Sequence, residues 1–179
     1  WGENSDGQLG DGTTTDRLSP VQVSGFTDVA AIAACRYSTI ALKSDGTVWA
    51  WGDNNIYGVL GDGTTIDRST PVSVSGLAQA RAVEMGNFHA MALKIDGTVW
   101  AWGENGAYEL GDGSTTDSLT PVKVLISPAT DFTGAVGIAA DGWHSMAVKT
   151  DGSVWGWGGN NYGQLGDGTT TTRQFPVQV

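Results

Sequence analysis

Short apolar stretches, each bounded by turn residues, follow one another along the whole chain. Between residues 28 and 74 there are four of them, at 28–35, 38–43, 47–52 and 71–74. They are rich in Ala, Val, Thr and Trp, which favours strands over helices. Asp45-Gly46 separates the second stretch from the third and predicts a tight hairpin turn. Because Pro71 heads the fourth stretch and lacks a donor, we expect that strand to lie at a sheet edge.

The same pattern returns at a nearly constant interval. Trp-Gly recurs in phase at 1, 51, 102 and 157, and Pro-Val occurs at 20, 71, 121 and 176. This phase predicts a single repeat domain over 1–179, divided into units 1–50 (incomplete at its start), 51–101, 102–156 and 157–179 (first half only). Four strands in a unit of about 50 residues are typical of a β-propeller blade. We therefore predict an all-β fold built from blades of four antiparallel strands.

The sizes of the side chains agree with blades packed around an axis. Alanine dominates the first two strands of each unit, where neighbouring blades would be closest together. The third strand carries Trp49 and Trp51 on one face, which would fill the wider gap further out. A β-sandwich is the competing architecture, but its strands would alternate apolar with polar residues. The apolar third strand favours the propeller.

The phase predicts about three blades plus one stray outer strand at 20–23. This is an open partial propeller, or part of a ring of about seven blades. Three blades cannot close a ring, so we expect the first and last to expose apolar faces that could support self-association. The chain is then either a fragment of a longer protein or a unit that assembles. We favour the fragment, because two copies joined end to start would leave the stray strands over.

Charge and composition exclude several classes of partner. The chain has 9 Lys and Arg residues against 19 Asp and Glu residues, and its formal net charge is −10. Such a surface repels phosphate backbones, so we expect no nucleic acid partner. No run of about 18 apolar residues occurs, so we expect no membrane span. No positively charged leader precedes an apolar stretch within the sequence, so we expect no targeting peptide in it. Cys35 is the single cysteine, which excludes an internal disulfide and a zinc cluster of cysteines.

No catalytic, cofactor-binding or metal-binding constellation emerges from the motifs. The aspartates of the Gly-Asp-Gly loops, such as Asp11 and Asp62, lack the ligand spacing of a calcium loop. We interpret them as capping their own turns. His89 and His144 occupy equivalent places in successive units, and we expect each to hydrogen-bond a neighbouring blade. The chain is therefore predicted not to be an enzyme and to need no cofactor.

Aromatic residues at one corner of the units are the best candidates for binding. Tyr37, Phe88 and Trp143 stand at equivalent positions, and His89 and His144 follow two of them directly. These five residues form a possible binding face, since Trp and Tyr often dominate affinity at interfaces. The alternative is that the three rings pack blade against blade.

The phrase "WGENSDGQLGDG", followed by "PVQV" and then by "AVEMGNFHAMALKIDGTVWAWG", resembles the repeat of the regulator-of-chromosome-condensation family. The resemblance covers essentially the whole chain, and its style is similar to that of bacterial members. The Gly-x-x-His element is intact as Gly86–His89. Tyr108 replaces the first glycine of Gly-Gln-Leu-Gly, and if that glycine needs a positive φ, we expect a different loop there.

The resemblance implies a propeller of about seven blades whose repeats act as binding platforms. Known roles in the family include nucleotide exchange on a Ran-type GTPase and inhibition of a β-lactamase by a secreted bacterial propeller. We therefore expect a non-enzymatic platform for a protein partner. The alternatives are a regulator of a nucleotide-binding protein, an inhibitor of a secreted enzyme, and carbohydrate binding by the aromatic face. The location is unknown, with an extracellular or cell-surface bacterial setting favoured.

Overall fold

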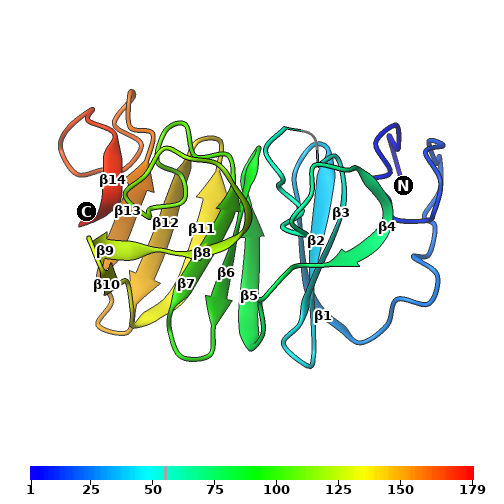
Figure 1. Cartoon of the computed structure of the whole chain (residues 1–179), viewed down its shortest axis with the longest axis horizontal. Helices are drawn as coiled ribbons and strands as arrows, with labels where there is room; N and C mark the ends of the chain where they lie inside the picture. The colour runs from blue at the N-terminus through cyan, green and yellow to red at the C-terminus, as the bar shows by residue number, and fades with distance from the viewer. Residues whose placement is uncertain (55) are drawn as a thin grey trace.

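The computed structural model describes residues 1–54 and 56–179 and confirms the all-β prediction. Figure 1 shows three four-stranded antiparallel sheets side by side. The first blade consists of β1 (Val29–Ala34), β2 (Ser38–Lys43), β3 (Val48–Gly52) and β4 (Arg68–Ser73). The second blade consists of β5 (Ala80–Met85), β6 (His89–Lys94), β7 (Val99–Gly103) and β8 (Ser118–Lys123). The third blade consists of β11 (Ala135–Asp141), β12 (His144–Lys149), β13 (Val154–Gly158) and β14 (Arg173–Gln178).

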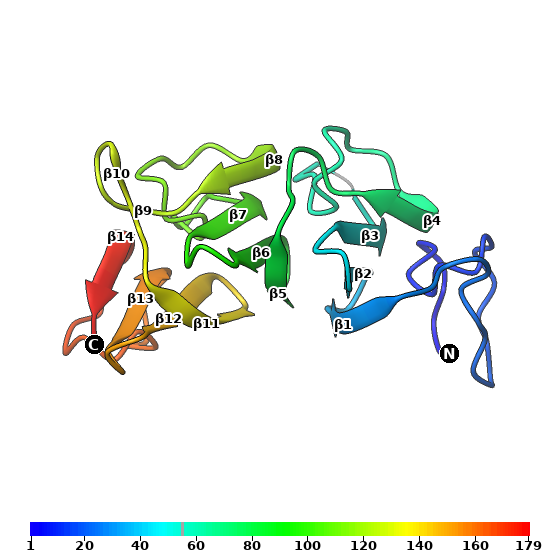
Figure 2. The ribbon, with the colours of Figure 1, turned by 90° about the horizontal axis from the view of Figure 1, so that it is seen from below.

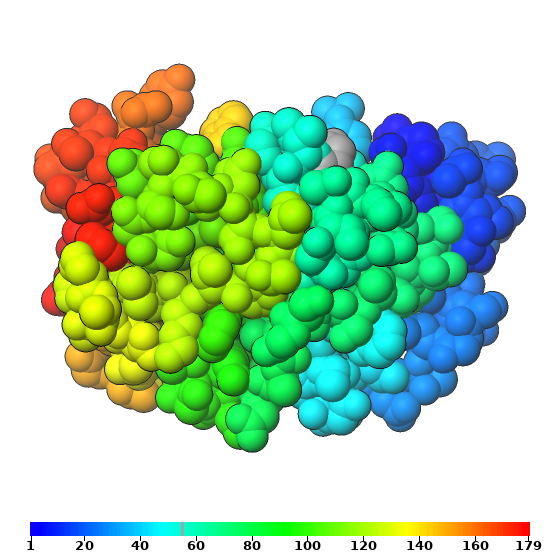
Figure 3. Space-filling view, in the orientation of Figure 1, coloured from blue at the N-terminus to red at the C-terminus, as the bar shows by residue number. Residues whose placement is uncertain are grey.

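The blades fan out along an arc, as the propeller prediction requires. Seen from below in Figure 2, β1, β5 and β11 lie on the inner side of the arc and β4, β8 and β14 on the outer side. The two ends of the chain lie at opposite ends of the molecule. Figure 3 shows that side chains fill the space that the ribbon leaves between the first and second sheets.

Local sequence explains the hairpin at the centre of each blade. Gly46 has a φ of 81°, and the carboxylate of Asp45 accepts a hydrogen bond of 2.9 Å from the amide of Thr47. This is the Asp-Gly turn that the sequence predicts. Beyond the turn, the ring of Phe26 lies edge-on to both Trp49 and Trp51, with centroids 5.8 and 5.6 Å away. Both tryptophans therefore share one face of β3, as predicted.

The second blade is covered on both of its faces, whereas the first and third blades are each covered on one face. On β6, Ala90, Met91 and Ala92 are completely buried. In contrast, Ile32 on β1 is 70% exposed and Val154 on β13 is 38% exposed. The fan is therefore open at both ends, with apolar side chains on its outermost faces.

A buried asparagine organises the long loop between the third and fourth strand of each blade. In the second blade, Oδ1 of Asn105 accepts a hydrogen bond of 3.0 Å from the amide of Leu110. Its Nδ2 donates to the carbonyl of Ser114 at 2.9 Å and to Asp112 at 3.2 Å. Asn4, Asn54 and Asn160 are buried in the same role. One side chain thus provides hydrogen-bond partners for several backbone groups of a loop that is not paired in a sheet.

Two expectations about the outer strands are corrected. The outer strand of the first blade begins at Arg68, so Pro71 lies inside it and not at its head. The pairing of β3 with β4 shifts register between Gly52 and Ala50, and this bulge accommodates a residue that cannot donate. Residues 20–23, predicted as a stray outer strand, form no strand, because no described strand lies alongside them to pair with. Only an isolated bridge joins Gly2 to Arg17 in the first unit.

The enlarged connection before the third blade folds into a small hairpin. Its strands are β9 (Leu125–Ser127) and β10 (Thr130–Asp131), and Lys123 forms an ion pair with Asp131. Phe132, directly after the hairpin, is completely buried against Trp155 and Trp157. In the part of the chain that the structure describes, no helix is long and apolar enough to cross a membrane.

Candidate functional site

The three corner aromatics occupy equivalent places but different surroundings. Each precedes the second strand of its blade, and the carbonyls of Tyr37, Phe88 and Trp143 accept hydrogen bonds from the start of the long loop of their own blade. Phe88 is half-buried against Tyr57 of the first blade, with ring centroids 5.4 Å apart. Tyr37 is half-buried, and the guanidinium of Arg36 lies 4.9 Å from its ring centroid. Trp143 alone of the three is open to solvent, at 53% exposure.

His89 lies inside the junction between the second and third blades. It is 1% exposed, and its Nε2 is 2.9 Å from Oγ of Ser145 on the third blade. That hydroxyl is also 2.9 Å from the carbonyl of Glu109. A carbonyl can only accept, so Ser145 donates to Glu109 and His89 must donate to Ser145. Burial, with a smaller contribution from His144, lowers the pKa of His89 to about 4, so its ring is neutral at pH 7.

This direction of the hydrogen bonds between His89, Ser145 and Glu109 does not suit nucleophilic catalysis. A serine nucleophile needs a histidine that accepts its proton, whereas His89 donates to Ser145. Ser145 is also completely buried. Within residues 1–54 and 56–179, no group of three or more His, Cys, Asp or Glu side chains could hold a metal ion. The aspartates of the loops bind their own loop, as in the ion pair of Asp62 with Arg68.

A cleft of about 410 Å³ lies beside Trp143 at the same junction. The loop of the second blade contributes Glu104, Ala107 and Glu109, and the third blade contributes Trp143, Tyr162 and Gln164. The cleft exists because Ala107 stands where the first blade has Tyr57. Tyr57 packs against Phe88, whereas the small side chain of Ala107 leaves the space beside Trp143 open.

Glu109 forms the floor of this cleft and is completely buried. Its Oε2 accepts a hydrogen bond of 2.8 Å from the amide of Ala107. Its Oε1 has no hydrogen-bond partner among the described residues. Burial, opposed by backbone hydrogen bonds and assisted by the negative charges of Glu104 and Asp117, raises the pKa of Glu109 to about 7. This carboxyl therefore keeps its proton to a higher pH than an exposed glutamate does.

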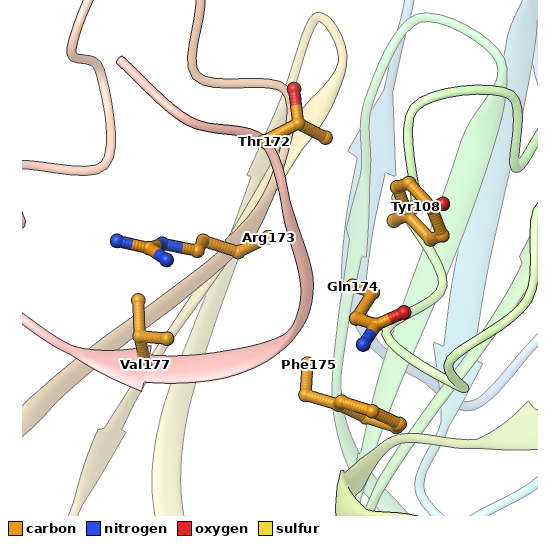
Figure 4. A pocket seen from close by; sticks show the side chains of 6 residues that line it. All are labelled: Tyr108, Thr172, Arg173, Gln174, Phe175 and Val177. Carbon is orange, nitrogen blue, oxygen red and sulfur yellow. The ribbon is translucent and has the colours of Figure 1, made fainter. Parts of the chain in front are cut away.

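A second cleft, of about 370 Å³, lies on the outer side of the same junction. Figure 4 shows Tyr108 on one wall and Gln174 and Phe175 of the β14 segment on the other. Arg173 extends away from Tyr108, and Val177 lies further from Tyr108 along β14. The cleft thus separates the long loop of the second blade from the outermost strand of the third.

Tyr108 corrects the expectation of a different loop at this position. Its φ is 67°, close to the 77° of Gly7 and the 68° of Gly58 at the equivalent places. The turn hydrogen bonds are also conserved between the units, since Gly111 donates to the carbonyl of Tyr108 as Gly61 does to that of Gly58. The buried asparagine fixes this backbone, so Tyr108 adopts the left-handed conformation that glycine normally supplies.

The outer cleft lies where tyrosine replaces glycine. A Cβ on Gly58 would lie 3.0 Å from Cα of Leu119, so glycine lets the outer strand approach closely. Gly63 donates to the carbonyl of Leu119 in that junction. The equivalent bond, from Gly113 to Gln174, is not formed among the described backbone groups. Tyr108 stands in place of Gly58 at this junction, and the ring of Phe175 lies against Gly113. The space seen in Figure 4 lies between the loop and β14 at this place.

Sequence reasoning identified Trp143 at this site but missed the carboxyl at its floor and the ring of Tyr162. Glu109, Ala107 and Tyr162 were not candidates, whereas His144 was one and does not line the cleft. A signal was present, because aligned units place Gln8, Val59 and Gln164 where Glu109 stands. This position holds a charged residue only in the unit that also has Tyr108 in place of glycine.

Comparisons with known proteins extend the resemblance over the whole chain. Residues 1–42, 45–93, 96–148 and 151–179 match a family model described as the regulator of chromosome condensation (RCC1) repeat. A second model of the same repeat matches residues 29–58, 80–108 and 136–164.

Several curated relatives align with the full length of the chain. It is 36% identical to the ultraviolet-B receptor UVR8 of Arabidopsis thaliana, covering 100% of this chain and 41% of the receptor. It is 32% identical to the mitochondrial RCC1 domain-containing protein RUG3 of Arabidopsis thaliana, covering 100% of this chain and 42% of RUG3. It is 34% identical to the human E3 ubiquitin-protein ligase HERC2, covering 100% of this chain and 4% of the ligase. The chain therefore spans less than half the length of these relatives.

Solved structures show the same arrangement of blades. Human WBSCR16 superposes with a TM-score of 0.84 at 25% identity, covering 98% of this chain and 46% of that protein. Yeast RCC1 (Prp20), solved with Kap60, superposes with a TM-score of 0.81 at 21% identity, covering 100% of this chain and 43% of that protein. These likenesses confirm that the three sheets are propeller blades.

Proposed function

Because the chain belongs to the regulator-of-chromosome-condensation (RCC1) repeat family, we propose that it is a non-enzymatic module that binds a protein partner at the Trp143 corner. The relatives carry different names, a photoreceptor, a mitochondrial protein and a ubiquitin ligase, yet each aligns with the full length of this chain. A binding frame is a function that such different proteins can share. Function in this fold is then set by the residues placed on the frame.

The exposure of Trp143 is the observation that carries this proposal. Of the three corner aromatics, it is the residue that is more than half exposed, and it borders a cleft. An exposed tryptophan beside a concave surface is typical of residues that contribute strongly to protein interfaces. His144 follows Trp143 at the start of β12 and is half-buried, so it can extend the same face. Tyr37 and Phe88 continue the face along the fan.

Affinity capture with matched variants tests the proposal. Wild-type protein, Trp143→Ala and Trp1→Ala would each be immobilised and exposed to the same extract of the source cells. Trp1 is 72% exposed and lies in the first unit, so its loss controls for removal of an exposed indole elsewhere. We expect proteins retained by wild type and Trp1→Ala to be lost from Trp143→Ala, and we expect direct binding with the purified partner to show the same order. Equal retention by all three would contradict binding at this corner.

The identity and behaviour of a captured partner separate the alternative functions. A GTPase whose nucleotide release is accelerated by the chain would indicate a regulator of a nucleotide-binding protein. A secreted hydrolase whose activity falls in the complex would indicate an inhibitor. Binding on a glycan array that disappears in Trp143→Ala would instead indicate carbohydrate recognition by the same ring.

A further inference from the structure

The cleft beside Trp143 combines an exposed aromatic ring with two carboxyl groups. Glu109 lies at its floor with a partnerless Oε1, and Glu104 lies at its wall. Asp117 is close enough to add to the rise in the pKa of Glu109. Among the described residues that line the cleft, none is basic. The site therefore offers negative charge and an aromatic face without an internal cation to neutralise them.

Several other aromatic rings of the molecule lie under its own cations. Arg36 lies over Tyr37, the residue equivalent to Trp143 in the first blade. On the third strands, Lys43, Lys94 and Lys149 lie over Trp49, Trp100 and Trp155. Gly142 stands where the first blade has Arg36, so the third blade cannot supply a cation to Trp143 from that position. No cation over the ring of Trp143 is found among the described residues.

From these observations we infer that the cleft binds one cationic side chain, an arginine or a lysine of a protein partner, against Trp143 and the carboxylates of Glu104 and Glu109. This inference rests on the proposed function and names the chemistry of its partner. A cation near an aromatic face is attracted by the ring quadrupole, most strongly for tryptophan. A nearby cation favours the ionised form of a carboxyl, so Glu109 would carry its full charge in the complex. The net charge of −10 favours the approach of a basic segment.

The junction between the first and second blades lacks this combination of groups. Between the first and second blades, Val59 stands at the position of Glu109, and Tyr57 packs on Phe88. The cleft at that junction, of about 310 Å³, is lined by Arg36, Tyr37, Asn87 and Phe88, so it has a cation of its own and no carboxyl among these residues. The recognition chemistry therefore comes from Ala107, Glu109 and Trp143 acting together, and not from the repeat frame.

Short peptides provide a direct test. Three capped pentapeptides, Gly-Ser-X-Ser-Gly with X as arginine, lysine or citrulline, would be titrated into ¹⁵N-labelled protein. The indole N–H signal of Trp143, assigned by its absence in Trp143→Ala, reports binding. Citrulline has the shape of arginine without its charge. We expect saturable shifts with arginine or lysine, and the stronger of the two identifies the natural side chain. Equal shifts with citrulline, or none with any peptide, would overturn the inference.

Matched carboxyl variants locate the charge. Glu109→Gln restores the residue that the first and fourth units carry as Gln8 and Gln164, so the fold should accept it. We expect this variant to bind the cationic peptide about 5- to 10-fold more weakly. Glu3→Gln removes the same charge at an exposed place in the first unit and should leave the affinity unchanged. Equal weakening by both variants would indicate general attraction to an acidic protein and would overturn the inference.

This test can fail without affecting the proposed function. If Trp143→Ala loses a captured protein but no cationic peptide shifts the indole signal, the corner binds a partner by other chemistry. If the peptides bind but capture does not depend on Trp143, the cleft recognises cations without serving the proposed interface.

Discussion

The junction between the first and second blades and the junction between the second and third use the same frame with different contents. In both, a buried tryptophan of the later blade donates its indole N–H to a loop carbonyl of the earlier one. Trp102 donates to Val59 at 2.8 Å, and Trp157 donates to Glu109 at 2.9 Å. The buried asparagines hold both loops in one conformation. Blades can therefore be joined identically while a few loop positions remain free to vary.

Those variable positions close the loop side of the first junction and leave that of the second open, while a cleft of about 310 Å³ between Tyr37 and Phe88 remains at the first. The first junction has Gly58, which allows close contact with Leu119, and Tyr57, which covers Phe88. The second has Tyr108, Ala107 and a buried carboxyl at Glu109, and clefts lie on both of its sides. Its interior also contains a polar chain from His89 through Ser145 to a carbonyl, where the first junction has Ala90. The contacts common to both junctions hold the blades together, and the substituted loop residues line the clefts.

Removing the shared tryptophan should have the largest effect on stability. Trp157→Ala deletes a completely buried indole and its hydrogen bond to Glu109, which should cost about 3–5 kcal/mol. Trp102→Ala is the matched change in the closed junction, and we expect it to cost at least as much because its surroundings can collapse less. Urea unfolding followed by far-ultraviolet circular dichroism measures both. A Trp157→Ala protein as stable as wild type would contradict the role given to the indole.

Replacing the buried carboxyl should have an intermediate effect that depends on pH. The folded pKa of Glu109 is raised from 4.5 to about 7, so the folded state binds more protons than the unfolded state between these values. Wild-type stability from this group is present at low pH and is lost as the pH rises from about 4.5 to 7. Glu109→Gln cannot ionise, so at pH 8 we expect it to be about 1–3 kcal/mol more stable than wild type, the lower value allowing for screening by solvent in the cleft.

The difference between the two proteins isolates Glu109 from the neighbouring histidine. The pKa of His89 is lowered from 6.5 to about 4, so its contribution is present above pH 6.5 and is lost as the pH falls toward 4. This term is common to wild type and Glu109→Gln and cancels in their difference. Thermal unfolding at pH 4, 6 and 8 should therefore show the variant gaining only as the pH rises. A constant difference at all three values would contradict a buried, pH-sensitive carboxyl.

The repeat made the fold predictable because each blade repeats the same local chemistry. Asp-Gly turns, paired tryptophans and alanine-rich inner strands recur in register, so four strands per unit and an open fan follow from the sequence. The start of β4 at Arg68 was not predictable, because a bulge lets Pro71 lie within the strand. Residues 20–23 show the opposite limit, since a strand pattern without a neighbouring strand forms no sheet.

The site was only partly predictable, because its properties depend on contacts between blades. Trp143 is exposed because Ala107, a residue of the preceding blade, is small. Glu109 looks like one more polar loop residue until the third blade covers it. Aligning the units and asking which loop positions break the pattern would have identified Ala107, Tyr108 and Glu109 together. Departures from a repeat are therefore the places where its function should be sought.

Closing the open junction should have the smallest effect on stability and the clearest local one. Tyr108→Gly removes a side chain from a left-handed backbone position, and we expect it to stabilise the fold by about 0.5–1 kcal/mol after the extra freedom of glycine in the unfolded chain is counted. With the ring gone, β14 can approach as Leu119 does at Gly58, and the amide of Gly113 can reach the carbonyl of Gln174. Hydrogen exchange should then show new protection at Gly113. Gly58→Ala is the converse change, and its Cβ would lie 3.0 Å from Cα of Leu119, so it should destabilise the closed junction. If Tyr108→Gly instead lowers stability and leaves Gly113 unprotected, the ring supports β14, and the openness of the junction does not come from Tyr108.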